Sequence, residues 1–297
     1  MSTENKPDIG FRAHDFGKCA SGEELALKAK SFLEGSCIQF APGKVLENAP
    51  KVLDRSWCEQ TYRPFAENNI RIAVLGCYIN PVHPDPEKQE AELRRFENAI
   101  ENAPYLGYPI VGTETGSLDP TNHRDERNWS DAAFLMFMRN IERLLKKAES
   151  YGVRMAIEAV ADKNTIDNAE RMYKVLSTFK SPNLCCIFDA VNIMPVKGPG
   201  NYESFYDEAV SMLAPYISIM HVKDFVWTDN CKEFPFEQPP VKRGEVPVGE
   251  GLMPWEMIFR LYRKYKVDHV PMLFENFNPQ TLRQSIEFVK KTAGAGK

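Results

Sequence analysis

The sequence predicts one parallel (β/α)8 barrel, also called a TIM barrel, folded as a single domain. Two observations lead to this prediction. Eight short apolar segments alternate with amphipathic segments along the whole chain, and no linker or shift in composition divides it. The length of 297 residues, of which 43% are hydrophobic and 26% charged, suits a soluble barrel of this kind.

The eight apolar segments predict the strands. They are short and rich in isoleucine or valine, as is typical of strands that are buried on both faces of a parallel sheet. In such a barrel, the C-terminal ends of the strands and the loops that follow them carry the functional residues. The predicted strands are residues 9–16, 37–42, 70–78, 108–115, 153–160, 184–192, 217–225 and 270–276.

The segments between the strands are amphipathic and predict helices. In residues 130–150, for example, Phe134, Met138 and Ile141 recur at helical spacing, and Ser130 is a suitable N-cap. Residues 43–69 show the least regular pattern of all the connections. The predicted helices are residues 21–34, 87–103, 130–150, 165–178, 201–214, 254–265 and 279–292.

The barrel is expected to occupy residues 9–297, after a polar tail of residues 1–8. One predicted loop is especially long: residues 226–253, which contain the sequence PVGEG (247–251) near their end. Long connections in compact domains often serve as lids or interface arms, and both readings stay open here. We also expect the protein to form a homo-oligomer.

Composition disfavours several classes of function. The net charge of −4 argues against a nucleic-acid or anionic-membrane partner. No apolar run approaches the roughly 20 residues needed to cross a bilayer, and the N-terminal MSTENKPDIG lacks the apolar stretch of a signal peptide. The seven cysteines include no C-x-x-C pair, and several lie in strand-like runs, which indicates reduced thiols. We therefore expect a cytoplasmic protein.

Four ionisable residues lie near the C-terminal ends of the last four predicted barrel strands: Glu158, Asp189, His221 and Glu275. Burying a charge is costly unless it has a partner. Three carboxylates and one imidazole that converge at the mouth of a barrel would bind a divalent cation. Oxygen ligands with one imidazole favour Mn²⁺, with Mg²⁺, Co²⁺ and Fe²⁺ as alternatives.

The motifs IEAV, FDAVN, HVKD, PVGEG followed by MPW, and FEN occur in this order along the chain. Together they resemble the motifs of the xylose isomerase-like barrels, a superfamily of sugar phosphate isomerases and epimerases. The resemblance covers nearly the whole chain. It implies that Glu158, Asp189, His221 and Glu275 bind one metal ion, and that the partner is a small-molecule sugar or keto-sugar.

The resemblance also implies a mechanism of proton transfer. A divalent metal polarises the carbonyl of the keto-sugar and stabilises the enediolate that forms when a proton leaves the adjacent carbon. Glu158 and Glu275 would be the catalytic residues, one removing the proton and the other returning one to the opposite face, which gives epimerisation. Return of the proton to the neighbouring carbon gives isomerisation instead.

Two other functions are compatible with the same four residues. A lyase would expel a hydroxyl group or an aglycone, as in inosose-type dehydration or the cleavage of a 3-oxo-C-glycoside. A barrel that binds sugar without catalysis is the other. A nuclease is disfavoured, because nucleases of this superfamily need additional histidines that the sequence lacks.

Five further residues are candidates for contacts with substrate. Asn192 stands where the ketose 3-epimerase branch usually has a histidine, so membership of that branch is not implied. Lys223 alternates to the same face as the predicted metal-binding histidine, where it would contact substrate or form a salt bridge with a carboxylate. His14 and Glu114 lie at the ends of the first and fourth strands, and Glu250 lies between two glycines.

Overall fold

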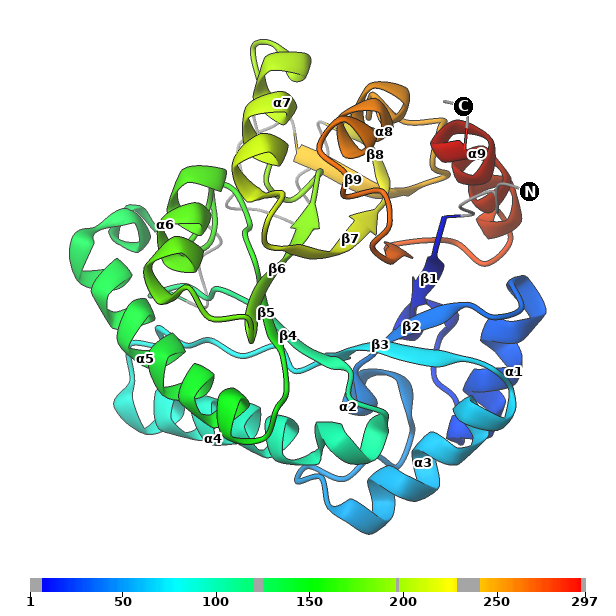
Figure 1. Cartoon of the computed structure of the whole chain (residues 1–297), viewed down its shortest axis with the longest axis horizontal. Coiled ribbons are helices and arrows are strands. Elements are labelled where there is room, and N and C mark those ends of the chain that lie inside the picture. The colour runs from blue at the N-terminus through cyan, green and yellow to red at the C-terminus, as the bar shows by residue number, and fades with distance from the viewer. Residues whose placement is uncertain (1–6, 120–124, 196–197, 229–240, 295–297) are drawn as a thin grey trace.

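The computed structural model describes residues 7–119, 125–195, 198–228 and 241–294. Eight parallel strands close into a barrel in the order β1-β10-β7-β6-β5-β4-β3-β2, and helices surround it (Figure 1). This confirms the predicted single (β/α)8 domain. None of the described helices is both long and apolar enough to cross a membrane.

The barrel strands are shorter than predicted, because most of them end at or within one residue of the polar strand-end residue. The segment predicted as strand 9–16, for example, ends at Arg12, and Ala13–Phe16 form a 3-10 turn. The barrel strands are β1 (Ile9–Arg12), β2 (Cys37–Phe40), β3 (Arg71–Gly76), β4 (Ile110–Glu114), β5 (Met155–Glu158), β6 (Leu184–Asp189), β7 (Ile217–Val222) and β10 (Met272–Phe274).

The helices begin at side-chain caps that the sequence contains. Ser21, Asp54, Asp85, Ser130 and Asn168 each accept a hydrogen bond from a backbone N–H of the first turn. The helices are α1 (Gly22–Phe32), α2 (Pro42–Val45), α3 (Arg55–Glu67), α4 (Pro86–Asn102), α5 (Asp131–Ser150), α6 (Ala169–Phe179), α7 (Tyr202–Leu213), α8 (Trp255–Lys264) and α9 (Leu282–Gly294).

The irregular segment 43–69, for whose helix the sequence pattern gave no bounds, contains α3 and overlaps α2, which begins at Pro42. The buried residues of α3 are Cys58, Thr61 and Phe65, at helical spacing. Only one of them is a large apolar residue, so the apolar stripe is weak although the helix has 13 residues and a capping aspartate.

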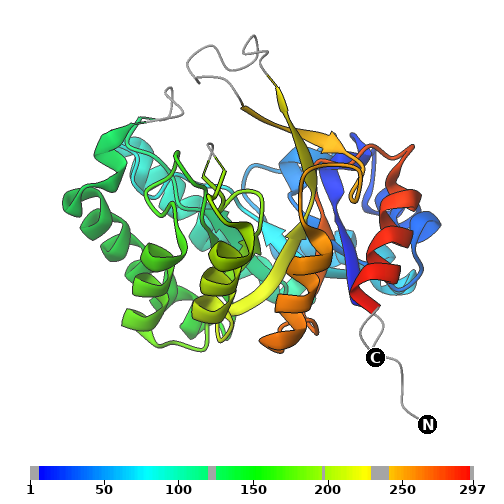
Figure 2. The ribbon, with the colours of Figure 1, turned by 90° about the horizontal axis from the view of Figure 1, so that it is seen from above.

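The predicted strand 217–225 and the loop 226–253 also differ from the structure. The strand divides at Lys223, and the chain continues as β8 (Asp224–Thr228), which pairs antiparallel with β9 (Val241–Val246). This two-stranded ribbon extends from the end of the barrel at which the parallel strands finish (Figure 2). Residues 229–240 of the proposed lid or arm lie outside the described residues.

Asp224 anchors the chain where it returns from the ribbon. Its carboxylate accepts backbone N–H bonds from Gly249, Gly251 and Met253 at 3.0, 3.2 and 3.0 Å. A Cβ atom on Gly251 would lie 2.1 Å from the Asp224 carboxylate, so only glycine fits there. The glycines of PVGEG therefore serve a close approach of the backbone, and the sequence analysis had assigned Asp224 no role.

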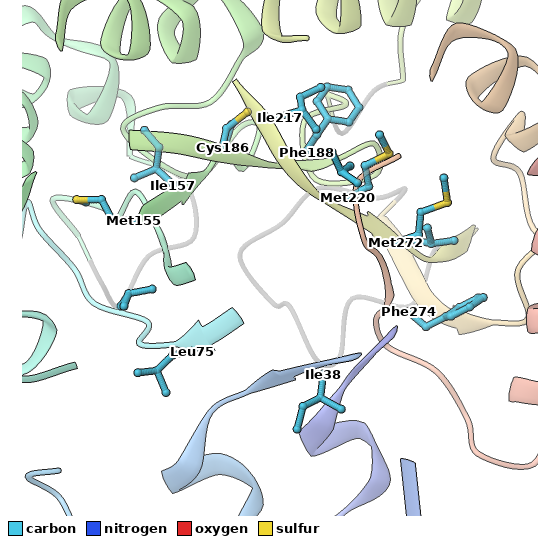
Figure 3. Packing of buried hydrophobic residues seen from close by; sticks show 14 of the residues in the cluster. Ile38, Leu75, Met155, Ile157, Cys186, Phe188, Ile217, Met220, Met272 and Phe274 are labelled. Atoms are coloured by element: carbon cyan, nitrogen blue, oxygen red, sulfur yellow. The ribbon is translucent and has the colours of Figure 1, made fainter. Parts of the chain in front are cut away.

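Alternation along each strand separates two apolar cores. The outer core lies between strands and helices, and Figure 3 shows its side chains, among them Ile38, Ile157 and Phe188, pointing away from the centre of the barrel. The inner core is small: Cys37, Ala73, Val74, Ala156, Cys185, Ile187, Ile219 and Leu273. Six cysteines of the described residues are free thiols, five of them buried, as the sequence analysis expected.

Gly10 tests how tightly the inner core is packed. A Cβ atom there would lie 2.3 Å from the Cys37 carbonyl oxygen and 2.5 Å from Leu273 Cδ2. Because a backbone carbonyl in a barrel strand cannot move aside, we expect Gly10→Ala to lower the free energy of unfolding by about 3 kcal/mol. Gly43→Ala is the control, since no atom lies within 4 Å of its Cβ position. Equal denaturant midpoints for the two variants would contradict this packing.

Candidate functional site

A layer of polar side chains lies directly above the inner core. Each of seven barrel strands has a small or apolar residue that faces the barrel interior. Two positions further along the chain, at or just past the end of that strand, comes a polar or ionisable residue. Because side chains alternate along a strand, the polar residue faces the interior as well. These residues are Arg12, Gln39, Glu114, Glu158, Asp189, His221 and Glu275.

The four predicted metal ligands meet in this layer. His221 Nδ1 lies 3.4 Å from an oxygen of each of Glu158, Asp189 and Glu275. All four residues are buried, with His221 fully inaccessible and Glu275 only 6% exposed. Ligand atoms of Glu158, Asp189 and His221 lie within 4.8 Å of one another. The structure thus brings together the residues that the sequence analysis selected.

The electrostatics of this cluster favour a cation. Burial by itself would lower the pKa of His221, but the negative charges of Glu275 and Glu158 raise it to about 10. His221 Nδ1 has no hydrogen-bond partner of good geometry within the described part of the chain, although it faces three carboxylates. The carboxylate oxygens and the imidazole nitrogen together are ligand atoms that fit a divalent cation such as Mn²⁺ or Mg²⁺.

Lys223 partly neutralises the carboxylates. Its Nζ lies 2.6 Å from Asp189 Oδ2 and 3.0 Å from Glu275 Oε2, and the side chain is buried. Burial would raise the pKa of Glu275, but the charges of His221 and Lys223 lower it to about 2. Of the two roles that the sequence analysis left open for Lys223, the structure shows the salt bridge.

Gln39 of β2 is a residue of this site that the sequence analysis missed. Its Oε1 lies 2.8 Å from His221 Nε2, and its Nε2 donates to Tyr78 Oη at 2.5 Å and weakly to Glu275 Oε1 at 3.4 Å. When the imidazole is neutral, as a metal ligand must be, a carbonyl oxygen at Nε2 keeps the proton on Nε2. The lone pair of Nδ1 then faces the carboxylates. The signal was present: Gln39 is the polar residue of the apolar strand CIQF, but it is not ionisable.

A cavity of about 220 Å³ opens onto this layer. Four of the predicted substrate-contacting residues line it, namely His14, Glu114, Asn192 and Lys223. It is also lined by Lys44 and Lys163, which no strand pattern marks because Lys44 lies in the short helix α2 and Lys163 in the loop after β5.

The predicted residues differ in their contacts. Asn192 donates to Glu158 Oε1 at 2.6 Å and so orients that carboxylate. Glu114 accepts a bond of 3.3 Å from Asn164. Burial and the positive charge of Arg12 lower the pKa of His14 to about 4, so its imidazole is neutral near pH 7.

Other candidates lie elsewhere. Glu250 is exposed, does not line the cavity, and hydrogen-bonds with Gln284 of α9. The segment 122–129 contains three further basic residues: Arg127 pairs with Asp125, and His123 and Arg124 lie outside the described residues. Of the aromatic residues near strand ends, Tyr78 lines the cavity, whereas Phe277 packs against Phe16.

Residues 34–292 match the family model of the xylose isomerase-like TIM barrel. A solved xylose isomerase domain protein from Planctomyces limnophilus is 18% identical, with a TM-score of 0.69 and coverage of 98% of this chain and 99% of the other. No curated protein sequence matches the chain.

Two further solved structures share the fold. One is a xylose isomerase-like TIM barrel protein from Mycobacterium smegmatis in complex with magnesium (16% identity, TM-score 0.72, 99% of each chain). The other is 3-keto-D-glucoside 4-epimerase from E. coli (14% identity, TM-score 0.71, 96% of this chain and 100% of the other). At these identities the likeness shows a common fold, and function has to be argued from the site.

Gln39 gives this site a direct test. We expect Gln39→Leu to weaken the binding of Mn²⁺ by about 10- to 100-fold, because the imidazole of His221 loses the partner that orients it. Calorimetric titration of the metal-free protein with Mn²⁺ measures this change. Gln60→Leu, an exposed position on α3, is the matched control. An unchanged Mn²⁺ affinity in a folded Gln39→Leu variant would contradict the orienting role.

Proposed function

Because the chain belongs to the xylose isomerase-like TIM barrel family, we propose that it is a divalent-metal-dependent isomerase or epimerase of a sugar or keto-sugar. The observation that carries the proposal is the buried cluster in which one imidazole nitrogen faces three carboxylates at 3.4 Å. These carboxylate oxygens and the imidazole nitrogen converge at the mouth of a cavity, and together they supply the donor types that a divalent cation binds.

In the proposed site, Glu158, Asp189, His221 and Glu275 hold the metal, with Mn²⁺ favoured over Mg²⁺, Co²⁺ and Fe²⁺ because the set contains one imidazole. When bound, a divalent cation there supplies Lewis acidity toward a substrate carbonyl oxygen. Asp189 has no further duty in this scheme: its Oδ1 accepts backbone bonds from Val191 and Asn192, and Lys223 holds its Oδ2. Its orientation is therefore fixed from both sides.

Glu158 and Glu275 are the proposed proton-transfer residues. They line the cavity from β5 and β10, and β6 and β7 lie between those strands in the barrel. A substrate carbon above the cluster is thus flanked by a carboxylate on each side. One carboxylate takes the proton from the carbon next to the carbonyl, and the other, in its protonated form, delivers a proton to the opposite face, which gives the epimer. Return of the abstracted proton by the first group to the neighbouring carbon gives the isomer instead.

Asn192 and Arg12 position these two carboxylates. Asn192 donates to Glu158, and Arg12 Nη1 lies 3.5 Å from Glu275 Oε2. Each glutamate therefore keeps a fixed direction toward the cavity. General acid–base catalysis requires such positioning, because the proton is transferred over hydrogen-bond distance.

A lyase is the second candidate, because the cavity contains donors beyond the two glutamates. Tyr78, Lys44 and Lys163 line it and could protonate a departing hydroxyl group or aglycone. The two reactions differ in their products. Release of water or a phenol from a 3-oxo sugar would favour the lyase over the isomerase or epimerase.

The proton-transfer roles predict the outcome of solvent exchange. Incubation of Mn²⁺-loaded protein with keto-sugars in D₂O should place deuterium on the carbon next to the carbonyl, as followed by proton NMR. Glu158→Gln and Glu275→Gln should each slow the exchange by at least about 100-fold, because positioned acids and bases contribute about that much. Glu23→Gln, an exposed position on α1, should exchange like the unaltered protein. Unslowed exchange in both variants would rule out these roles.

Metal binding should also stabilise the fold. At a free Mn²⁺ concentration about 100 times the dissociation constant, mass action adds about 2.7 kcal/mol to the free energy of unfolding. Chelation with EDTA should remove this gain, as thermal melts would show. The double variant Asp189→Asn with His221→Ala should show no Mn²⁺-dependent shift, and a shift as large as that of the unaltered protein would place the metal elsewhere.

A further inference from the structure

We propose that the substrate carries an anionic group, a carboxylate or a phosphate, and that Lys44 and Lys163 at the cavity receive it. This inference rests on the proposed function, because it concerns the substrate of the same site. It goes further by naming a charge class among sugars and keto-sugars.

The two lysines differ from the other cations of the cavity. Arg12 is held by Asp15 at 2.6 Å, and Lys223 is held by Asp189 at 2.6 Å. Within the described ranges of the chain, neither Lys44 nor Lys163 forms an ion pair, although both line the cavity. Their positive charges are therefore available to a ligand.

Hydrogen bonds hold the backbone at each lysine, and both side chains line the cavity. The carbonyl of Lys163 accepts a 2.8 Å hydrogen bond from Asn128, which is fully buried. Lys44 lies in α2, where its N–H donates to the Ala41 carbonyl at 2.9 Å. Its Nζ lies 4.0 Å from the centre of the Tyr78 ring, which also lines the cavity. The lysines therefore reach the cavity from two different connections, Lys44 from the helix α2 after β2 and Lys163 from the loop after β5.

Charge balance points to an anion. With a divalent cation held by three carboxylates and a neutral imidazole, the cluster keeps one negative charge, which Lys223 cancels. Arg12 is balanced by Asp15. The remaining charges of the cavity lining are Lys44 and Lys163 against Glu114, so the described lining carries one surplus positive charge.

A neutral sugar would leave this surplus charge without a counterpart. Ammonium groups can bind hydroxyl groups, but a hydrogen bond between two charged partners is about twice as strong as a neutral one. His14, neutral near pH 7, also lines the cavity, and its buried Nδ1 has no partner among the described residues. It adds a hydrogen-bonding group without adding charge. The lining therefore combines hydroxyl-binding groups with a surplus of cations, as a sugar acid or sugar phosphate requires.

The test is a comparison of three ketoses that differ in charge: D-fructose, D-fructose 6-phosphate and D-tagaturonate. Each is titrated calorimetrically into Mn²⁺-loaded protein, after a separate titration with Mn²⁺ alone. We expect one or both anionic ketoses to bind at least about tenfold more tightly than D-fructose. Their affinities should fall as the salt concentration rises, whereas that of D-fructose should not. The anionic ketose with the larger gain in affinity over D-fructose shows whether the site prefers a carboxylate or a phosphate.

Lys44→Met and Lys163→Met are the decisive variants, alone and combined. The double variant should lose the preference for anionic ketoses by about tenfold or more, because its affinity for D-fructose should fall much less than its affinity for the anionic ketoses. Lys146→Met is the matched control, because Lys146 pairs with Glu142 on the exposed face of α5. Circular dichroism checks that each variant is folded.

The outcomes separate the two proposals. Absence of Mn²⁺ binding would contradict the proposed function. Mn²⁺ binding without a preference for either anionic ketose would overturn only the charge inference. Equal weakening of all three ketoses in the double variant would also overturn it, because the lysines would then bind hydroxyl groups.

Discussion

Three buried carboxylates at the mouth of one barrel are the constraint on which the rest of the site depends. Glu158 and Asp189 offer oxygens within 4.8 Å, and two like charges about 4 Å apart repel by about 4 kcal/mol at an effective dielectric constant near 20. The structure offsets this repulsion with His221 and with Lys223, whose Nζ lies 2.6 Å from Asp189. A divalent cation is a partner that the donors of this cluster fit, and its charge would offset the repulsion among the carboxylates.

The barrel provides the geometry for this cluster by strand alternation. Residues two positions before the polar layer are small or apolar, such as Gly10, Cys37 and Ala156, and they fill the interior below it. The intervening residues, such as Ile38 and Ile157, pack against the helices (Figure 3). A shift of one residue in the register of any strand would exchange the side chains that face the interior with those that face the helices. A charged side chain would then be buried against the helices, and an apolar one such as isoleucine would face the polar layer. The apolar core therefore enforces the register of the site.

Sequence reasoning succeeded where a pattern is local and repeated. The eight barrel strands and seven of the helices follow from apolar periodicity, and the four strand-end ionisable residues follow from their interruption of that pattern. It failed for α3, whose buried face includes Thr61 and Cys58, and for β8 and β9, which lie in a region with no apolar alternation. Asp224 was missed for a related reason: its partners are backbone N–H groups 25 to 29 residues away, which no spacing rule reveals.

The sequence by itself determined the fold class and the chemical types at the barrel mouth, because alternation and strand-end polarity are properties of short segments. Only the tertiary structure decided how those groups are coupled. It placed Gln39 of the second strand against His221 of the seventh, 182 residues away, and joined Lys223 to two carboxylates. It also brought Lys44 of α2 and Lys163 of the loop after β5 to one cavity. The physical reason is barrel closure, which converts positions that are distant along the chain into neighbours whose charges and hydrogen bonds must balance locally.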